Sequence, residues 1–128
     1  MRRILLGAAS LVTLGLVALI AALLLAPLAP SPPGPEPGRS LFQSHCATCH
    51  GSDGRGGSWR ARLLLLRPGN LAGPETAALP GAYLADIIRQ GGSTFGKPGM
   101  PSFGFTLTDD EVQALIAYLR ALPSAPKP

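Results

Sequence analysis

Two cysteines and a histidine stand together near the middle of the chain, in the order Cys46-Ala47-Thr48-Cys49-His50. This C-x-x-C-H spacing is typical of the covalent attachment site of a c-type haem. With only two residues between them, both thiols lie on one side of a helical turn and can form thioethers with the two vinyl groups of a single haem. His50 then follows beneath the porphyrin. The motif therefore predicts one haem c, bound through Cys46 and Cys49, with His50 as an iron ligand.

Other chemistries of the cysteine pair fit the sequence less well. A thioredoxin-like dithiol belongs in a βαβ setting, whereas the flanks here favour helix and loop. A zinc site needs about four ligands, and the only cysteines and histidines are crowded into residues 45–50. A disulfide across two residues would add little stability and leave His50 without a role. The second imidazole, that of His45, is expected to be partly exposed at a helix end and to point away from the haem.

Met100 is the candidate for the second axial ligand. It lies in a Gly/Pro-rich stretch, residues 93–105, between Gly99 and Pro101. A methionine in such a loop can be a surface or gap-filling residue, but its neighbours favour a loop of fixed shape. His/Met ligation closes both axial positions of the iron and raises the haem potential. Because a closed iron favours electron transfer over catalysis, we expect an electron carrier and not an enzyme.

Length and charge place limits on the class of protein. The chain has 128 residues and a formal net charge of +4, to which Arg2 and Arg3 contribute two positive charges. Two haem propionates would offset much of the remainder. No alternation of basic and aromatic residues accompanies this charge, so no nucleic-acid binding is expected. The part that follows the N-terminal apolar run is small for a self-sufficient core, and a bound haem would add the missing apolar mass.

Residues 4–26 form an apolar run without a charge. A helix of this length measures about 34 Å, which is enough to cross a bilayer core of about 30 Å. A cleaved signal peptide is the alternative, although signal cores are usually shorter. Arg2 and Arg3 favour a cytoplasmic N-terminus. We therefore predict a single-pass anchor over residues 1–28 in the cell membrane, with the haem domain on the periplasmic or extracytoplasmic side.

The rest of the chain divides into a tether, a domain and a tail. Residues 29–37 are rich in proline and are expected to form a polyproline II tether, or unstructured filler, between membrane and domain. Residues 38–123 are predicted to form the haem domain, and residues 124–128 a disordered tail.

Three helices are predicted within the domain. The first covers residues 38–45 and runs into the haem motif, and the second covers residues 80–90. The last begins at Thr108, which forms a capping box with Glu111, and ends at Pro123.

The stretch from Trp59 to Arg67 is ambiguous, because its four consecutive leucines fit no single face of a helix. Part of it is expected to cover one edge of the haem. Trp59 can donate its indole N–H to a haem propionate, or it is an ordinary packed residue. Arg60 and Arg62 can pair with a propionate, or they are solvated charges. Together with other cations they can also form a basic rim for an acidic partner.

Several motifs together resemble the class I cytochrome c fold. They are Gly38-x-x-x-Phe42 before the haem motif, Pro68-x-Asn70-Leu71, Gly99-Met100-Pro101, and a final helix that contains Leu115-x-x-Tyr118-Leu119. The resemblance covers residues 36–123. It is closest to the small bacterial monohaem cytochromes and to the cytochrome c subunits of membrane oxidase and dehydrogenase complexes.

The resemblance implies an all-α fold, in which three to four short helices wrap around one covalently bound haem, here preceded by one N-terminal transmembrane helix. The first helix of the domain would pack across the last, with Gly38 and Phe42 against Leu115 and Tyr118.

The resemblance also implies the roles of the site residues. His50 would be the proximal ligand of the iron and Met100 the distal ligand. The carbonyl of Pro68 would accept a hydrogen bond from Nδ1 of His50 and thereby fix its tautomer.

Three functions follow as hypotheses. The first is a membrane-anchored, extracytoplasmic carrier of the respiratory chain, which takes single electrons from a quinol-oxidising complex or a dehydrogenase to an acceptor such as a terminal oxidase. The second is a fixed cytochrome c subunit of a larger membrane oxidoreductase. The third is a ligand-binding or catalytic haem domain in which Met100 dissociates from the iron.

Overall fold

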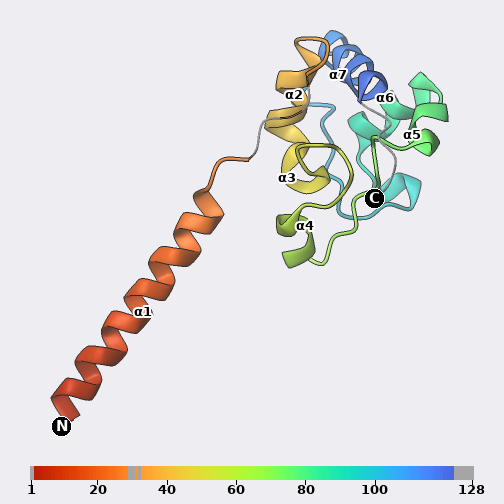
Figure 1. Cartoon of the computed structure of the whole chain (residues 1–128). Helices are drawn as coiled ribbons and strands as arrows, with labels where there is room; N and C mark the ends of the chain where they lie inside the picture. Colours follow the sequence, from red (N-terminus) through yellow and green to blue (C-terminus); the bar gives the residue numbers. More distant parts are fainter. Residues whose placement is uncertain (1, 29–30, 32, 123–128) are drawn as a thin grey trace.

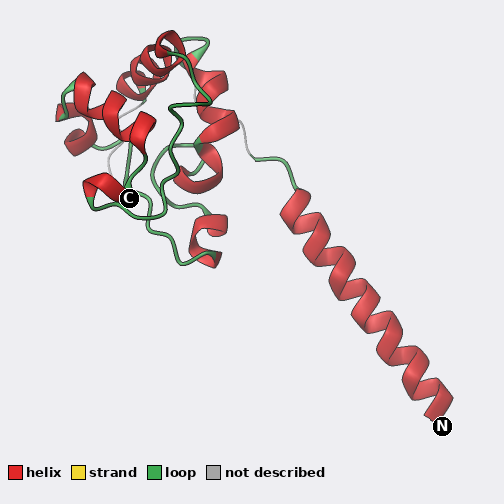
Figure 2. Ribbon diagram, turned by 180° about the vertical axis from the view of Figure 1, so that it is seen from behind, coloured by secondary structure: helices red, strands yellow, loops and turns green. Residues whose placement is uncertain are grey.

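The computed structural model describes residues 2–28, 31 and 33–122, with the side chains of the first helix described from Leu11 onward. All secondary structure in these residues is helical, as predicted (Figures 1 and 2). In chain order the helices are α1 (Arg2–Leu25), α2 (Gly38–His45), α3 (Ala47–His50), α4 (Trp59–Leu63), α5 (Pro74–Ala78), α6 (Gly81–Gln90), the 3₁₀ helix η1 (Ser93–Phe95) and α7 (Asp109–Ala121).

Helix α1 projects away from the other helices, which pack together (Figure 1). Its large apolar side chains from Leu11 to Leu25 are between 46% and 83% exposed. The predicted membrane span over residues 4–26 lies partly outside the described side chains. Among the residues that the structure describes, no helix is long and apolar enough to cross a membrane.

The core of the domain forms where α2 packs on α7. Gly38 permits the close approach, because a Cβ atom there would lie 2.1 Å from the carbonyl oxygen of Ala114 and 2.7 Å from Cβ of Tyr118. One turn later, the ring of Phe42 contacts that of Tyr118 with a centroid distance of 5.3 Å. Both rings are fully buried, and Leu115 is 2% exposed beside them. The expected contact of the first helix with the last is confirmed.

Helix α7 begins with the predicted capping box. The hydroxyl of Thr108 accepts from the backbone N–H of Glu111 at 3.3 Å, and the Glu111 carboxylate accepts from the backbone N–H of Thr108 at 2.8 Å. On either side, Leu107 and Val112 are buried, as in a hydrophobic staple. The helix ends at Ala121. Pro123, its predicted end, and the tail lie outside the described residues.

Helix α6 runs as predicted and stops at Gly91, which adopts a φ of 81°. Near this end, the Arg89 guanidinium donates to the Asp109 carboxylate at 2.7 Å and so joins α6 to the start of α7. The short helix α5 was not predicted. Arg120 of α7 donates to the carbonyls of Ala77 and Leu79 and holds the end of α5 in place.

The start of α4 is fixed by Ser58, which is 8% exposed. Its hydroxyl accepts from the backbone N–H of Arg60 at 3.2 Å, which is the N-cap interaction. The same hydroxyl donates to the carbonyl of Thr48 at 2.5 Å. One serine therefore both begins α4 and attaches it to the helix that carries the haem motif.

The end of α4 explains why the four consecutive leucines fit no single face of a helix. The N–H of Leu65 donates to the carbonyl of Arg62 at 3.0 Å, and that of Leu66 to the carbonyl of Ala61 at 2.8 Å. This is a Schellman closure, which needs a left-handed residue, and Leu65 takes that position with a φ of 56°. Because glycine or asparagine is usual there, the sequence contained no stop signal at this point.

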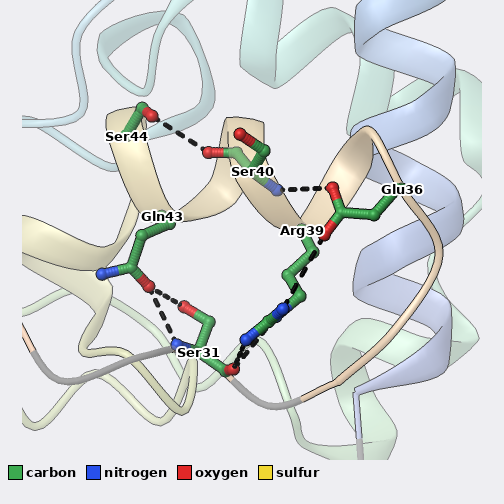
Figure 3. Close-up of a pocket in the computed structure, with 6 residues that line it drawn as sticks. All are labelled: Ser31, Glu36, Arg39, Ser40, Gln43 and Ser44. Atoms are coloured by element: carbon green, nitrogen blue, oxygen red, sulfur yellow. Dashed lines mark hydrogen bonds and ion pairs between the residues drawn. The ribbon is translucent and has the colours of Figure 1, made fainter.

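The described part of the Pro-rich segment makes contacts with the domain. Its described residues, 31 and 33–37, are here called the strap. The N–H of Ser31 donates to the side-chain carbonyl of Gln43 at 2.9 Å, and Arg39 donates twice to the carbonyl of Ser31, at 3.1 and 3.2 Å (Figure 3). A Cβ atom on Gly34 would lie 2.7 Å from two ring carbons of Tyr118. The strap thus lies against α2 and α7.

Candidate haem-attachment site

Both cysteines lie where α2 gives way to α3. The N–H of Cys46 donates to the carbonyl of Phe42 at 2.9 Å, and the N–H of His50 then donates to the carbonyl of Cys46 at 2.9 Å. Cys46 and Cys49 are free thiols and partly exposed. Burial, followed by the nearby Cys49, raises the pKa of Cys46 to about 12. A redox-active dithiol needs a thiolate near neutral pH, so this environment disfavours the thioredoxin-like alternative.

His50 is held in the orientation that an iron ligand requires. Its Nδ1 lies 3.2 Å from the carbonyl oxygen of Gly69. Because a carbonyl can only accept, Nδ1 carries the proton and the lone pair of Nε2 is left for a metal. Burial lowers the pKa of His50, and the bond to Gly69 opposes this with a smaller effect. The imidazole therefore stays neutral at physiological pH, which is its metal-binding form.

The acceptor for His50 is the carbonyl of Gly69, one residue after the predicted Pro68. The Pro68 carbonyl instead lies against Gly56, where a Cβ atom would be 2.4 Å from its oxygen. The N–H of Leu71 donates to the carbonyl of Gly54 at 2.7 Å. This hydrogen bond sets the register of residues 68–71 against the loop at residues 51–57. This register leaves Gly69, and not Pro68, opposite His50.

The loop at residues 51–57 ties these parts together. Gly51, Gly54 and Gly56 all have a positive φ, of 81°, 74° and 77°. The N–H of Gly56 donates to the carbonyl of His50 at 2.6 Å, so the loop turns back onto the haem motif. A chain of short contacts thus connects the His50 backbone, the Gly56 loop and the acceptor at Gly69.

The loop that carries Met100 is fixed by the end of α6. The N–H of Gly92 donates to the carbonyl of Met100 at 3.0 Å, and the N–H of Lys97 donates to the carbonyl of Gly92 at 2.8 Å. A Cβ atom on Gly92 would lie 2.0 Å from the Lys97 oxygen and 2.9 Å from Cβ of Met100. Met100 is partly buried and packs against the core. These contacts support the expected loop of fixed shape, while ligation by Met100 stays a prediction.

Leu66 joins the α4 segment to the methionine loop. A Cβ atom on Gly99 would lie 2.5 Å from Cδ2 of Leu66. The last of the four leucines therefore turns inward beside Met100. The expectation that part of the Trp59–Arg67 stretch covers one edge of the haem stays a prediction.

Arg60 makes contacts with Trp59 and with the end of α1 that the sequence did not predict. The Arg60 guanidinium lies over the Trp59 ring at 5.0 Å from its centroid. It also donates to the carbonyls of Leu24 and Ala26 at 3.1 and 2.8 Å, at the C-terminal end of α1. Arg60 thus caps α1, a long-range contact without a local signal in the sequence. Trp59 is 46% exposed, and its contact with a propionate stays a prediction.

His45 agrees with its expected role outside the site. It is exposed at the end of α2, and its ring meets the ring of Phe103 edge-on at a centroid distance of 5.8 Å. This aromatic contact gives His45 a packing function.

The donor set fits a covalent haem. Two free thiols stand on one turn, and a histidine with a free Nε2 follows them directly. In the part of the chain that the structure describes, no three His, Cys, Asp or Glu residues are grouped to hold a metal ion. When bound, the haem would supply a one-electron iron couple. The chain would supply Cys46, Cys49, His50 and Met100 to hold it.

Comparison with known proteins agrees with this geometry. Residues 33–119 match the family described as cytochrome c oxidase, cbb3-type, subunit III. The chain is also similar to the gluconate 2-dehydrogenase cytochrome c subunit of Pantoea cypripedii, with 33% identity over 92 residues. These residues cover 66% of this chain and 20% of that protein, so the match spans about a fifth of the relative's length.

The family match includes every proposed haem ligand and runs from the strap through most of α7. Together with the C-x-x-C-H turn and the oriented His50, this match identifies the domain as a cytochrome c domain. The protein is a small c-type cytochrome and belongs to the family described as subunit III of cbb3-type cytochrome c oxidase.

Proposed function

We propose that this protein carries one electron at a time on a haem c that is bound through Cys46 and Cys49, with His50 and Met100 as axial ligands. The observation that carries the proposal is the hydrogen bond from Nδ1 of His50 to the carbonyl of Gly69. It directs Nε2 toward an iron and strengthens the imidazole as a ligand. The anchored methionine loop supports the second ligand, since Gly92 fixes the Met100 backbone.

Closure of both axial positions gives the domain an electron-transfer role and no catalytic one. The proposed partners are redox proteins: a quinol-oxidising complex or a dehydrogenase as donor, and a terminal oxidase as acceptor. The similarity to a cytochrome c subunit of a gluconate dehydrogenase supports the dehydrogenase class. Redox partners of this kind make small, transient contacts.

The proposed location is the cell membrane, with α1 as a single-pass anchor and the haem domain on the extracytoplasmic side. The support comes from residues 4–26, which carry no charge, and from the two arginines before them. It also comes from the exposure of the apolar side chains of α1 from Leu11 onward, which would be favourable only in lipid or against other helices.

A redox titration with optical spectra of the purified protein tests the haem assignment. We expect one reversible one-electron couple, a low-spin spectrum in both oxidation states, and no binding of carbon monoxide to the reduced protein at neutral pH. A high-spin spectrum, or tight carbon monoxide binding, would show that Met100 does not close the iron.

A fixed subunit of a larger membrane oxidoreductase is the second candidate, and two observations favour it. The strap is held against α2 and α7, and Arg60 caps the end of α1. Both contacts restrict the reach of the haem domain, as suits a relay at one position. Extraction in a mild detergent followed by size-exclusion chromatography separates the candidates. A lone chain supports the mobile carrier, whereas co-migration with other subunits supports the relay.

A further inference from the structure

Three leucines at the end of α4 are exposed although they are large and apolar. Leu63, Leu64 and Leu65, here called the leucine turn, are 67%, 65% and 89% exposed, and Trp59 at the start of α4 is 46% exposed. Exposed apolar patches of this kind on a small domain mark a surface that a membrane or another protein covers.

The outward direction of the leucine turn is built into its backbone. The Schellman closure at Leu65 reverses the chain, so that Leu66 turns inward to Gly99 while the three preceding leucines stay outside. Ser58 fixes the other end of α4 through its hydrogen bond to Thr48. A short element attached at both ends thus presents apolar side chains outward.

The leucine turn lies beside the end of the proposed anchor. Arg60, on the same helix, donates to the carbonyls of Leu24 and Ala26 in the last residues of α1. In both views of the chain α4 lies on the side of the domain toward α1, whereas α7 lies on the far side (Figures 1 and 2). If α1 is embedded in a bilayer, α4 is therefore level with the lipid–water interface.

The charges around the leucine turn fit an anionic lipid surface. Arg62 and Arg67 flank it and are exposed. Within the described part of the chain, neither has an ion-pair partner. Segments that lie in the headgroup region of a membrane typically have leucine and tryptophan on their apolar side and arginine at the edges.

We propose that the leucine turn, with Trp59, Arg62 and Arg67, docks on the anionic phospholipid surface of the membrane that holds α1. This inference rests on the proposed anchoring by α1. The docked turn gives the domain a second point of attachment, and two linked attachments bind more firmly than either alone. It also limits the orientations in which the haem domain meets membrane partners.

Site-directed spin labelling of the full-length holoprotein tests this contact. Because both native cysteines are bonded to haem, a Leu64→Cys substitution supplies the sole free thiol for a nitroxide. The labelled protein is reconstituted in vesicles with anionic phosphatidylglycerol. The collision rates of the nitroxide with oxygen and with a polar nickel chelate are then compared in the reduced protein. The matched control is Gln113→Cys, on an exposed position of α7.

We expect the ratio of oxygen to chelate collisions to rise at position 64 in the vesicles, and to keep its aqueous value at position 113. With Arg62→Gln and Arg67→Gln in addition, the rise at position 64 should diminish. Raising the salt concentration should have the same effect, because it screens the attraction to anionic lipid.

The outcomes separate this inference from the anchoring on which it rests. A label at position 64 that stays water-accessible, in protein that floats with the vesicles, overturns the docking and leaves the anchor intact. Protein that does not float with vesicles overturns both. Protection that needs an added protein subunit assigns the turn to that partner, and a changed haem spectrum in Leu64→Cys assigns it to the haem edge. Either result overturns the lipid contact.

Discussion

At the scale of single residues, the site depends on glycines whose missing side chains leave room for other groups. Gly56 makes room for the Pro68 carbonyl, and Gly92 makes room for the Lys97 carbonyl and for Met100. Neither glycine is a ligand. Each fixes the backbone that positions one proposed ligand, Gly56 on the His50 side and Gly92 on the Met100 side.

The substitution Gly56→Ala should weaken the hydrogen bond between His50 and Gly69. The new Cβ atom would lie 2.4 Å from the Pro68 oxygen, and the φ of 77° is unfavourable for alanine. Moving this segment reduces the basicity of the imidazole, so the haem potential should rise in a redox titration. The left-handed backbone should also cost about 1–2 kcal/mol in urea unfolding.

Gly57→Ala is the matched control for this substitution. Gly57 has no atom within 4 Å of its Cβ position and no positive φ. A potential that shifts equally in both variants would contradict the role given to Gly56.

The substitution Gly92→Ala should displace Met100. The Cβ atom would overlap the Lys97 carbonyl, and its 2.9 Å contact with Met100 Cβ leaves no room for adjustment on the other side. We expect the reduced variant to bind carbon monoxide, as measured by its optical spectrum. Gly81→Ala, at the start of α6 and with nothing within 4 Å of its Cβ position, should keep the wild-type spectrum. Unchanged ligation in Gly92→Ala would argue against Met100 as ligand.

At the scale of elements, α7 is the support on which the helix before the haem motif rests. Its N-terminus combines a capping box with acidic residues in the first turn, and both stabilise a helix start. Because Phe42 and Tyr118 are packed together, loosening α7 also loosens α2.

Removing the cap should therefore lower the stability of the whole domain. We expect Thr108→Ala to reduce the free energy of unfolding by about 1 kcal/mol, as measured by urea denaturation of the holoprotein. Thr106→Ala is a suitable control, because Thr106 is exposed and lies outside the capping box. Equal losses in the two variants would show that the capping box does not carry the effect.

The capping box also predicts a pH dependence. Hydrogen bonds from the backbone N–H and then the hydroxyl of Thr108 lower the pKa of Glu111 below its ordinary value of 4.5. A carboxylate with a lowered folded-state pKa contributes stability above 4.5 and loses it as the pH falls through the folded value. The stability difference between wild type and Glu111→Gln should therefore shrink below pH 4.5. A difference that is constant from pH 7 to pH 3 would contradict this linkage.

At the scale of the whole molecule, the strap and Arg60 connect the domain to α1 at two places. Ser31 is held by Gln43 and Arg39, and the last carbonyls of α1 are held by Arg60. The orientation of the haem domain relative to α1 thus depends on side chains that lie outside the haem motif.

Loosening the strap should increase its mobility without changing the haem. A nitroxide is attached at Pro33→Cys, an exposed position of the strap. Its spectral line shape should report slower motion of the label in the wild-type background than with Arg39→Ala. The reason is that Arg39 donates two hydrogen bonds to Ser31, and bonds from a charged donor are worth about 1.5–3 kcal/mol.

Arg55→Ala provides the control for this experiment, since Arg55 pairs with Asp53 in a different loop. The haem spectrum should be the same in all three proteins. Identical line shapes with and without Arg39 would show that the strap is not held by this residue.

Much of the protein follows from local sequence signals. The C-x-x-C-H motif specifies haem attachment because thioether chemistry needs two thiols on one helical turn. The capping box at Thr108 and the glycine after Gln90 mark helix ends through interactions within a few residues. Gly38 and Phe42 are recognisable because their four-residue spacing places them on one helix face. The helices they mark are found close to where they were expected.

Only the tertiary structure decided the features that depend on contacts between distant residues. The acceptor for His50 is Gly69 because the Leu71–Gly54 hydrogen bond sets the register, and no local rule distinguishes Gly69 from Pro68. Arg60 reaches carbonyls more than thirty positions away. Leu65 ends a helix in a conformation that its residue type disfavours. In each case the packing of the whole chain decided the outcome, because local sequence signals either were missing or, at Leu65, favoured another conformation.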